Sequence, residues 1–427
     1  MKKIWIMNHY AADMYRDKAG RHYWFAQKLS EKGYEPVVFC ANTFHNKPEQ
    51  IDTGNKKIAV KYEGTIPYIF VKTVPYTANG FSRLRNMIHF FLNLFPAARK
   101  CRKMFGKPNV ILASSVHPLT MVAGNLIAKR FKIPCICEIR DLWPEAIFAY
   151  GKISEKSIFG KLLIIGEHWI YRNAKALIFT KEGDTDYLKE RGWTTAQGGD
   201  IDLRKCYYIN NGVNNQIFHE SIKKDILPDE DIENSTKFNV IYAGIIRPTN
   251  RLDIILDAAK QLRNEKDIQF LVYGSGSELE RLRQRIVVEN IHNVKLKGFV
   301  ERKYIPYILN RSNVNILNYS QSQYNWSRGN SSNKLFEYLA SGKPVISTVR
   351  MGYDIIERYK CGFSLEVCDS EHLAHAVMKV KNMEIENYIQ YCKNAQTAAL
   401  DFDFDILTDK LEKVIAYALE TSYEKIY

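Results

Sequence analysis

A short segment around residue 334 places two opposite charges near the predicted start of a helix. Ser332 and Asn333 are types that often begin helices, and Gly342 predicts the end of this one. Helix N-terminal N–H groups can hold a phosphate, whereas a cation such as Lys334 is unfavourable for the helix itself. Lys334 therefore indicates an anion nearby, and Glu337 is placed to accept hydrogen bonds from vicinal hydroxyls, as in a ribose. The alternative is a surface helix on which both charges face water.

Two further candidates follow predicted strands in the first half of the chain. The strands are residues 109–113 and 134–139, and His117 and Asp141 come after them. Side chains at the carboxyl ends of parallel strands point into a ligand crevice. A partly buried Asp141 would then orient or deprotonate an acceptor hydroxyl. The alternatives are that Asp141 is a turn residue before Pro144 and that His117 is only hydrogen-bonded within the fold.

A glycine-bearing loop with two arginines follows a predicted strand in the second half. The strand covers residues 238–243, Gly244 follows it, and a helix is expected from 252 to 263. Guanidinium groups suit a diphosphate because they stay charged and donate in bidentate fashion. Arg247 is the first candidate for this contact and Arg251 the alternate. The alternative is that both are surface cations.

The elements that position these residues alternate between strand and helix. Residues 3–7 are expected to form a buried strand, 8–22 a polar loop, 23–32 a helix and 36–40 a second strand. This order opens a doubly wound domain of the nucleotide-binding type, and the second half of the chain repeats the alternation. The sequence therefore predicts an α/β protein.

The domain boundary is expected near a polar, glycine-bearing stretch at residues 193–205. We predict two doubly wound Rossmann-like domains that face a cleft. The first comprises residues 1–200 together with a C-terminal helix, at about 408–427, that crosses back to it. The second comprises residues 201–407.

Composition is that of an ordinary globular protein, with 46% apolar and 25% charged residues among 427. The eight cysteines show neither zinc spacing nor a disulfide framework, which favours reduced thiols in a cytosolic protein. We find no apolar run of the ~18 residues that a spanning helix needs, and no signal peptide. The expectation is a chain that is neither secreted by a classical signal nor membrane-spanning.

The net charge of +14 is concentrated in one part of the chain. Residues 64–137 contain eleven Lys or Arg and no Asp or Glu, a pattern typical of proteins that meet phosphates or anionic lipid. Within this stretch, residues 81–105 combine aromatic and basic residues. They predict an amphipathic helix lying in a membrane interface, with aromatics at the acyl boundary. The alternative is a core-packing helix with a solvated basic face; nucleic-acid binding is not expected, because no base-stacking or groove-reading motif accompanies the charge.

Several of these segments resemble one known family. Residues 330–346 are similar to the C-terminal signature of the retaining GT-B glycosyltransferases of family four, a loop and helix followed by Ala-x-Gly-x-Pro-Val. Members usually carry two glutamates eight positions apart; Glu337 matches the second, and Gly329 occupies the first position. Residues 138–144 resemble the Asp-Leu-Trp-Pro of a bacterial subgroup that builds surface polysaccharides, and residues 207–214 resemble the turn that opens the second GT-B domain.

The resemblance implies roles for individual residues. Arg247 and Lys334 would stabilise the departing diphosphate, with Asp141 and His117 as the other catalytic candidates. Gly20, the glycine of the first loop, would approach the diphosphate; the alternative is that it only forms a plain turn. A Gly-x-Gly turn would lie beside the donor, and a later segment would bind the base. The third glycine of a dinucleotide fingerprint is absent from that turn, so an NAD site is not expected. The donor-binding residues implied are Gly20, Gly244, Arg251, Gly274, Gly298, Phe299, Val300, Ser332, Asn333, Leu335 and Glu337.

The function implied is a retaining transferase, of hexosyl or N-acetylhexosaminyl type, acting on a nucleotide diphosphate sugar, with UDP favoured. The acceptor would be a hydroxyl of a lipid-linked saccharide in surface polysaccharide synthesis. The protein would lie at the inner face of the cell membrane, held by the basic region 83–132. No cofactor is expected, and no metal, because no Asp-x-Asp group stands at a strand end facing the donor.

Two other functions are compatible with the same fold. A GT-B nucleotide-sugar epimerase or hydrolase would turn over its substrate without any acceptor. A non-catalytic scaffold at the membrane surface is suggested by Gly329, which stands where the family usually has a glutamate.

Overall fold

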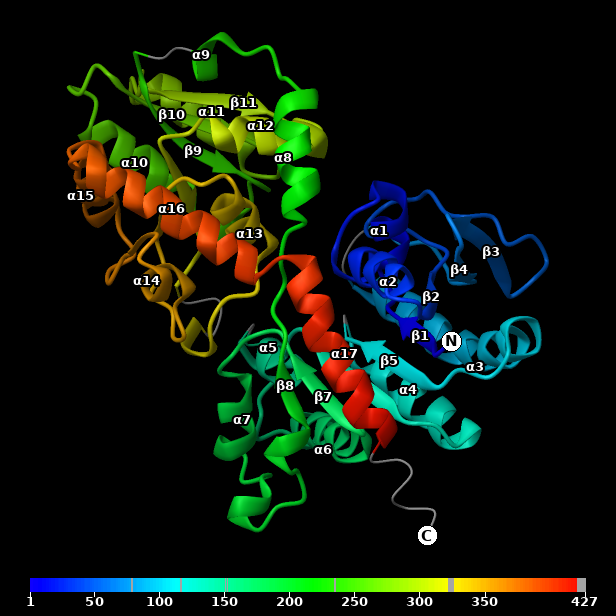
Figure 1. The fold of residues 1–427 in the computed structure, drawn as a ribbon. Coiled ribbons are helices and arrows are strands. Elements are labelled where there is room, and N and C mark those ends of the chain that lie inside the picture. The colour runs from blue at the N-terminus through cyan, green and yellow to red at the C-terminus, as the bar shows by residue number, and fades with distance from the viewer. Residues whose placement is uncertain are drawn as a thin grey trace. The chain divides into compact units, whose positions relative to one another are not determined.

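The computed structural model describes residues 1–77, 80–115, 117–149, 151, 153–233, 236–321 and 326–420 of the chain. The chain divides into two compact units, each built on its own sheet (Figure 1). Unit 1 is Met1–Asn210 with Phe404–Tyr427, and unit 2 is Asn211–Asp403. The division after Asn210 lies beyond the predicted boundary at residue 200.

Unit 1 contains an eight-stranded sheet in the order β3-β4-β2-β1-β5-β6-β7-β8. Among the described residues its pairings are parallel, apart from β3 against β4. The central strands are continuous apolar runs because helices cover both faces of such a sheet. The strands are β1 Lys3–Met7, β2 Glu35–Ala41, β3 Ile58–Glu63, β4 Ile66–Val71, β5 Val110–Ser114, β6 Cys135–Ile139, β7 Ala176–Phe179 and β8 Cys206–Tyr208.

The helices of unit 1 pack on this sheet in groups. Helix α4 contacts both α3 and α6, whereas α2 packs against α17, the C-terminal helix that returns to unit 1. Residues 421–427 of the predicted C-terminal helix lie outside the described residues. The helices are α1 Ala11–Asp17, α2 Arg21–Glu31, α3 Phe81–Phe105, α4 Pro118–Phe131, α5 Trp143–Ala149, α6 Ile158–Asn173, α7 Asp184–Glu190 and α17 Phe404–Glu420.

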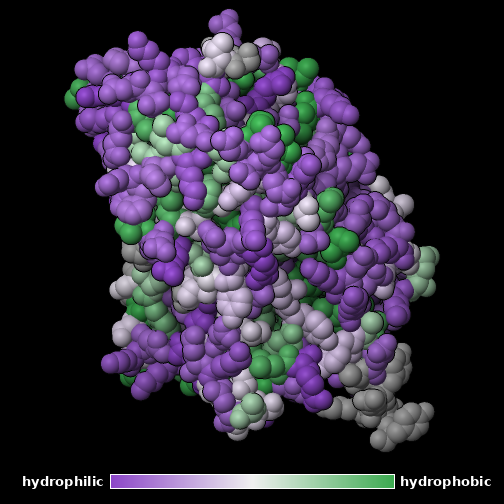
Figure 2. Space-filling view, turned by 60° about the vertical axis from the view of Figure 1, so that its left-hand side comes forward, coloured by the Kyte–Doolittle hydropathy of each residue, from purple (hydrophilic) through white to green (hydrophobic). Residues whose placement is uncertain are grey.

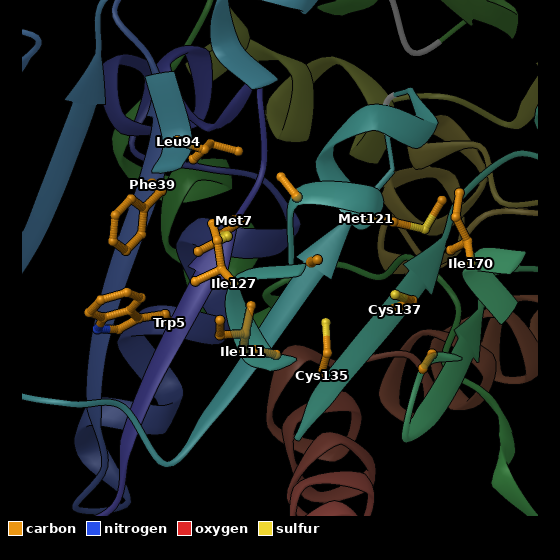
Figure 3. Close-up of a cluster of buried hydrophobic side chains, with 14 of the residues drawn as sticks. Trp5, Met7, Phe39, Leu94, Ile111, Met121, Ile127, Cys135, Cys137 and Ile170 are labelled. Atoms are coloured by element: carbon orange, nitrogen blue, oxygen red, sulfur yellow. The ribbon is translucent and has the colours of Figure 1, made fainter. Parts of the chain in front are cut away.

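The core of unit 1 lies between the sheet and these helices (Figure 3). Trp5 of β1 and Phe39 of β2 are fully buried, with ring centroids 4.9 Å apart. Met121 of α4 and Ile170 of α6 lie close together over β6. This packing fixes α4 and α6 against the strands whose carboxyl ends carry the candidate residues.

The prediction of a polar loop at residues 8–22 is wrong. The middle of this segment is the short helix α1, and α2 begins at Arg21 rather than Tyr23. Gly20 separates the two helices with a φ of 102°, a left-handed conformation that favours glycine. The polar composition concealed α1 because its buried side is only Ala11 and Ala12.

Helix α3 has two apolar sides. Phe90 and Leu94 are fully buried in the core, so the prediction that the aromatic residues of this segment contact lipid is wrong for Phe90. The opposite side exposes Leu84, Ile88 and Leu92 to solvent. Among the described residues, we find no helix that combines the length and the apolar character needed to cross a bilayer.

Unit 2 contains a six-stranded parallel sheet in the order β11-β10-β9-β12-β13-β14. Buried residues of β9, β10, α10 and α15 form its core. The strands are β9 Phe238–Ala243, β10 Ile268–Tyr273, β11 Val294–Gly298, β12 Val314–Leu317, β13 Val345–Ser347 and β14 Gly362–Ser364. The helices are α8 Asn215–Lys224, α9 Glu230–Glu233, α10 Asp253–Gln261, α11 Leu279–Val288, α12 Ile305–Asn310, α13 Asn333–Ala340, α14 Ile355–Tyr359, α15 Ser370–Lys381 and α16 Ile385–Asp401.

One face of the surface is mainly polar. On the face drawn in Figure 2, hydrophilic residues cover most of the area and apolar residues form separate patches.

The predicted fold class, α/β with two Rossmann-like domains and a returning C-terminal helix, is confirmed.

Candidate active site

Lys334 lies at the start of α13 in unit 2, between two aromatic rings. Its Nζ is 4.7 Å from the ring centroids of both Tyr242 and Tyr319 and 3.1 Å from the Tyr242 hydroxyl. Burial, and then the positive charge of Arg247, lower the pKa of Lys334 to about 7, while the negative charge of Glu337 acts in the opposite direction. A partly buried cation beside another cation is costly, and a bound anion would relieve that cost.

The start of α13 has the features of an anion site. Ser332 precedes the helix, and its side chain caps none of the described N–H groups. Instead its hydroxyl lies 2.6 Å from that of Tyr319, while Asn333 is exposed. The first N–H groups of the helix, with their partial positive charge, therefore lie beside Lys334. Leu335, the next donor-binding candidate, is fully buried and anchors the helix to the core.

Three glycines allow the loops after β9, β10 and β11 to run against one another. A Cβ on Gly274 would lie 1.8 Å from the carbonyl oxygen of Gly244, and one on Gly244 would lie 2.9 Å from Lys334 Nζ. The N–H of Gly274 donates to the carbonyl of Gly298 at 2.7 Å. No other residue fits at Gly274, and the absence of a side chain at Gly244 lets Lys334 occupy its position.

The remaining candidates of unit 2 divide into those near Lys334 and those with other surroundings. Arg247 is exposed and close enough to affect the pKa of Lys334. Arg251 is also exposed, and its left-handed backbone (φ 43°) presents its carbonyl to the Asn318 amide. Glu337 accepts a hydrogen bond from Arg302 at 3.0 Å. In the predicted base-binding segment Phe299 is 74% exposed and Val300 is half-buried.

In unit 1, the end of β6 carries a buried carboxylate that the sequence analysis did not single out. Glu138 is fully buried and accepts hydrogen bonds from Arg21 Nε at 2.7 Å and from Ser114 Oγ at 2.6 Å. Its second oxygen also lies 2.7 Å from His22 Nε2. Arg21 further donates to the carbonyls of Ile209 and Asn210, where the chain leaves unit 1.

Charge in this cluster is balanced within it. Burial alone raises the pKa of Glu138, but the Arg21 guanidinium and the hydrogen bonds from His22 and Ser114 outweigh it and hold that pKa well below its usual value. Burial lowers the pKa of His22 despite the neighbouring carboxylate. The cluster is therefore one ion pair, Arg21 with Glu138, supported by a neutral His22.

His117 is buried and paired with a second histidine. Its Nε2 lies 2.6 Å from Nδ1 of His9, whose ring stacks on Phe90. Burial, then Arg83, lowers the pKa of His117 to about 3. In this contact one ring nitrogen donates its N–H and the other accepts it, which requires that the accepting ring is neutral. Two protonated rings would direct N–H groups at each other. No hydrogen-bond partner of His117 Nδ1 is found among the described residues.

Asp141 differs from its prediction. Its side chain is 68% exposed and 4.0 Å from Lys181 Nζ, so the expectation of a partly buried carboxylate is wrong. Gly20 precedes α2, and thus stands next to Arg21 of the buried cluster. The residues that sequence analysis missed are Arg21, His22, Glu138, Tyr242 and Tyr319. A signal for the first three existed, since Gly20-Arg21-His22 and Glu138 lie in segments that had already been selected.

Two Rossmann-like units, the second with a glycine-lined cationic loop beside a helix start, are the architecture of the GT-B fold class. Residues 21–197 match the family model described as glycosyl transferase 4-like domain, and residues 223–398 match that described as glycosyl transferases group 1. The chain belongs to the GT-B glycosyltransferases of family four, and the predicted resemblance is confirmed.

A curated relative and solved structures agree with this assignment. The chain is 30% identical over 221 residues to TuaH of Bacillus subtilis (strain 168), named as a glycosyltransferase of teichuronic acid biosynthesis. That match spans 48% of this chain and 51% of TuaH, so the chain spans about half the length of this relative.

Among solved structures, trehalose 6-phosphate synthase of Burkholderia multivorans has a TM-score of 0.72 at 13% identity, covering 100% of this chain and 98% of that one. HepE of Anabaena in complex with UDP has a TM-score of 0.63 at 15% identity, covering 97% and 100%. Likeness at these identities shows the fold.

Proposed function

We propose that the protein is a retaining glycosyltransferase that moves a sugar from a nucleotide diphosphate sugar to a hydroxyl. The observation that carries the proposal is Lys334, held between two tyrosine rings beside the start of α13 and the Gly244 loop. Glycosyl transfer needs stabilisation of the leaving diphosphate as its charge grows. Lys334, Arg247 and the helix start supply positive charge for it.

UDP is the favoured nucleotide, because HepE, which shares the fold, was solved with UDP. Unit 2 would bind the donor, with Glu337 near the ribose and residues 298–300 near the base. Unit 1 would bind the acceptor. We assign no catalytic base: in the retaining mechanism on one face of the sugar, the donor phosphate takes the acceptor proton. His117 and the exposed Asp141 are then residues that position the acceptor, and no metal is required.

The acceptor is proposed to be a lipid-linked saccharide of surface polysaccharide synthesis, of the kind that the name TuaH suggests for that relative. The basic region 83–132 would hold the protein on the anionic inner face of the membrane. In support, α3 and α4 carry most of the cations of this region, and α3 exposes Leu84, Ile88 and Leu92. Arginine and lysine beside exposed apolar side chains suit anionic headgroups over acyl chains.

Calorimetric titration with UDP and GDP, followed by transfer assays, tests the proposal. Lys334→Ala should weaken UDP binding and lower the rate of transfer by roughly 10²–10³-fold while the protein stays folded. Lys379→Ala is the matched control, because Lys379 also lies over an aromatic ring of unit 2, at 4.3 Å from that of Phe363, but on α15. We expect it to bind UDP as the wild type does.

Three results would contradict the proposal. Binding of neither nucleotide would favour the non-catalytic scaffold. Turnover of a nucleotide sugar without any acceptor would favour an epimerase or hydrolase. Equal transfer by Lys334→Ala and wild type would remove Lys334 from the site.

A further inference from the structure

A small cavity lies in unit 1 beside the end of β6, between α4, α5 and α6. Its volume is about 190 Å³, and its walls are mostly apolar: Leu119 and Val122 from α4, Trp143 and Ile147 from α5, and Leu163 and Ile170 from α6. Helices α4 and α5 both pack on α6 (Figure 1). Glu167 also lines the cavity, but the hydroxyls of Tyr171 and Tyr187 each donate to its carboxylate at 2.6 Å. Apolar ligands, rather than charged ones, fit such walls.

Gly166, in the middle of α6, keeps one side of this cavity open. It lines the cavity and is itself exposed, and a Cβ built on it would meet no atom within 4 Å. A glycine inside a helix costs about 1 kcal/mol relative to alanine. Packing does not require this glycine, since a larger side chain has room. Its effect is to leave the cavity accessible.

The cavity extends from the catalytic end of unit 1 to an exposed apolar surface. At one end it is lined by Asp141 and by Pro118, which follows His117. At the other it is lined by Leu162, which is 58% exposed. Ile158 and Ile165, one turn to either side on α6, are 82% and 63% exposed. A ligand in the cavity can therefore reach both the polar strand ends and the outside of α6.

A second, larger cavity at the far end of α4 and α6 indicates which environment this surface meets. Its volume is about 880 Å³, and it contains Trp169 but no Asp or Glu among the residues that line it. Its cationic lining residues are Lys107, Lys129, Lys132, Arg172 and Lys175. Five cations next to the apolar side of α6 complement the anionic headgroups and acyl chains of a membrane.

We propose that the 190 Å³ cavity binds the hydrocarbon chain of the lipid-linked acceptor at the end nearest its headgroup. This inference rests on the proposed function. The chain enters from the membrane along the exposed side of α6 and passes Gly166. The headgroup then lies at the ends of β5 and β6, near Asp141.

Calorimetry with two isoprenoid phosphates tests this site, because they share a headgroup and differ in chain length. The full-length protein should bind farnesyl phosphate at least about ten-fold more tightly than dimethylallyl phosphate, since each buried methylene adds affinity. Gly166→Leu, which narrows the opening, should abolish that preference without lowering thermal stability. Val122→Phe, from the opposite wall, should have the same effect and covers the case in which Gly166→Leu does not fold.

Thr397→Leu is the control, since Thr397 is exposed in the middle of α16 in unit 2, away from the cavity. It should keep the chain-length preference. Equal binding of the two phosphates by the wild type would overturn the proposal, as would an unchanged preference in both cavity variants. The proposal would also be overturned if the cavity variants lost binding to phosphatidylglycerol vesicles as strongly as they lose binding to farnesyl phosphate. The cavity would then hold the chains of bulk membrane lipid. UDP binding, which depends on unit 2, separates these outcomes from failure of the proposed transferase.

Discussion

Units 1 and 2 both have charged residues near the carboxyl ends of parallel strands. In unit 1 the charge is paired with an opposite charge, whereas in unit 2 a cation lies near a second cation. In unit 1, Glu138 is fully buried and its oxygens are bonded to Arg21, His22 and Ser114. In unit 2, Lys334 lies against two tyrosine rings, and the positive charge of Arg247 lowers its pKa. The first cluster is complete without a ligand, whereas we propose that the second binds an anion.

This difference separates structural charge from binding charge. Neutralising one partner of a complete buried pair leaves the other uncompensated, so the cost falls on folding. Removing a cation whose role is to bind a ligand changes the free energy of unfolding little, but it lowers ligand affinity and the rate of transfer. The predictions below test this separation, starting with the largest expected effect.

Glu138→Gln should lower the free energy of unfolding by roughly 3–5 kcal/mol, because Arg21 stays buried without its counter-charge. Chemical denaturation monitored by circular dichroism measures the loss. The control is Glu280→Gln, whose carboxylate is 71% exposed and pairs with Arg283 at the surface. That change should alter stability by less than about 1 kcal/mol. A loss at Glu138 no larger than that of the control would mean that the cluster does not hold unit 1 together.

Gly244→Ala should lower kcat/KM for transfer by about 100-fold, because a Cβ there would displace Lys334, and misplacement of a catalytic group by about 1 Å can cost that much. Stability should change little, since the atoms nearest that Cβ are the flexible end of a lysine. Steady-state kinetics and thermal unfolding on the same sample distinguish the two effects. Wild-type kinetics in this variant would show that the position of Lys334 is unimportant.

The buried histidines of unit 1 predict a pH effect on stability. The pKa of His117 is about 3 in the fold and near 6.5 when unfolded, so below pH 6.5 the unfolded chain binds the extra proton. This group should destabilise the fold by roughly 2 kcal/mol between pH 7 and pH 5. Burial raises the pKa of Glu167 to about 7, which acts in the opposite direction. The contribution of His117 must therefore be measured by difference.

Denaturation of His117→Asn and wild type at pH 7 and pH 5 provides that difference. Relative to wild type, the variant should be about 2 kcal/mol more stable at pH 5 than at pH 7. His219→Asn, at an exposed histidine of α8, should show no such change. Parallel curves for His117→Asn and wild type would show that His117 titrates normally in the fold.

The strands and helices could be predicted from the sequence better than the buried charged residues. Strands were predictable because buried parallel strands are continuous apolar runs, and Lys334 because a cation in the first helical turn is locally unfavourable. Glu138 was not, since its partner Arg21 is 117 residues away and no local pattern connects them. Asp141 was predicted to be partly buried and is exposed. The prediction failed because distance along the chain from a strand end does not reveal which side chain turns inward.

The smallest predicted effect follows from the pKa of Lys334, which is about 7. A bound diphosphate favours the cationic form and raises this pKa, so UDP affinity should fall as the pH rises above 7, by up to about ten-fold per unit. Binding at pH 8 should also take up a proton, detectable by calorimetry in buffers of different ionisation enthalpy. UDP itself does not change charge there, since its phosphate titrates near pH 6.

Lys334→Arg provides the decisive comparison, because a guanidinium stays charged throughout this range. If Lys334 is the titrating group, the variant should bind UDP with the same affinity at pH 7 and pH 8 and take up no proton. A slope as steep as that of the wild type would assign the titration to another residue. The cation of unit 2 would then be no more dependent on a ligand than the ion pair of unit 1, and the contrast between the two clusters would fail.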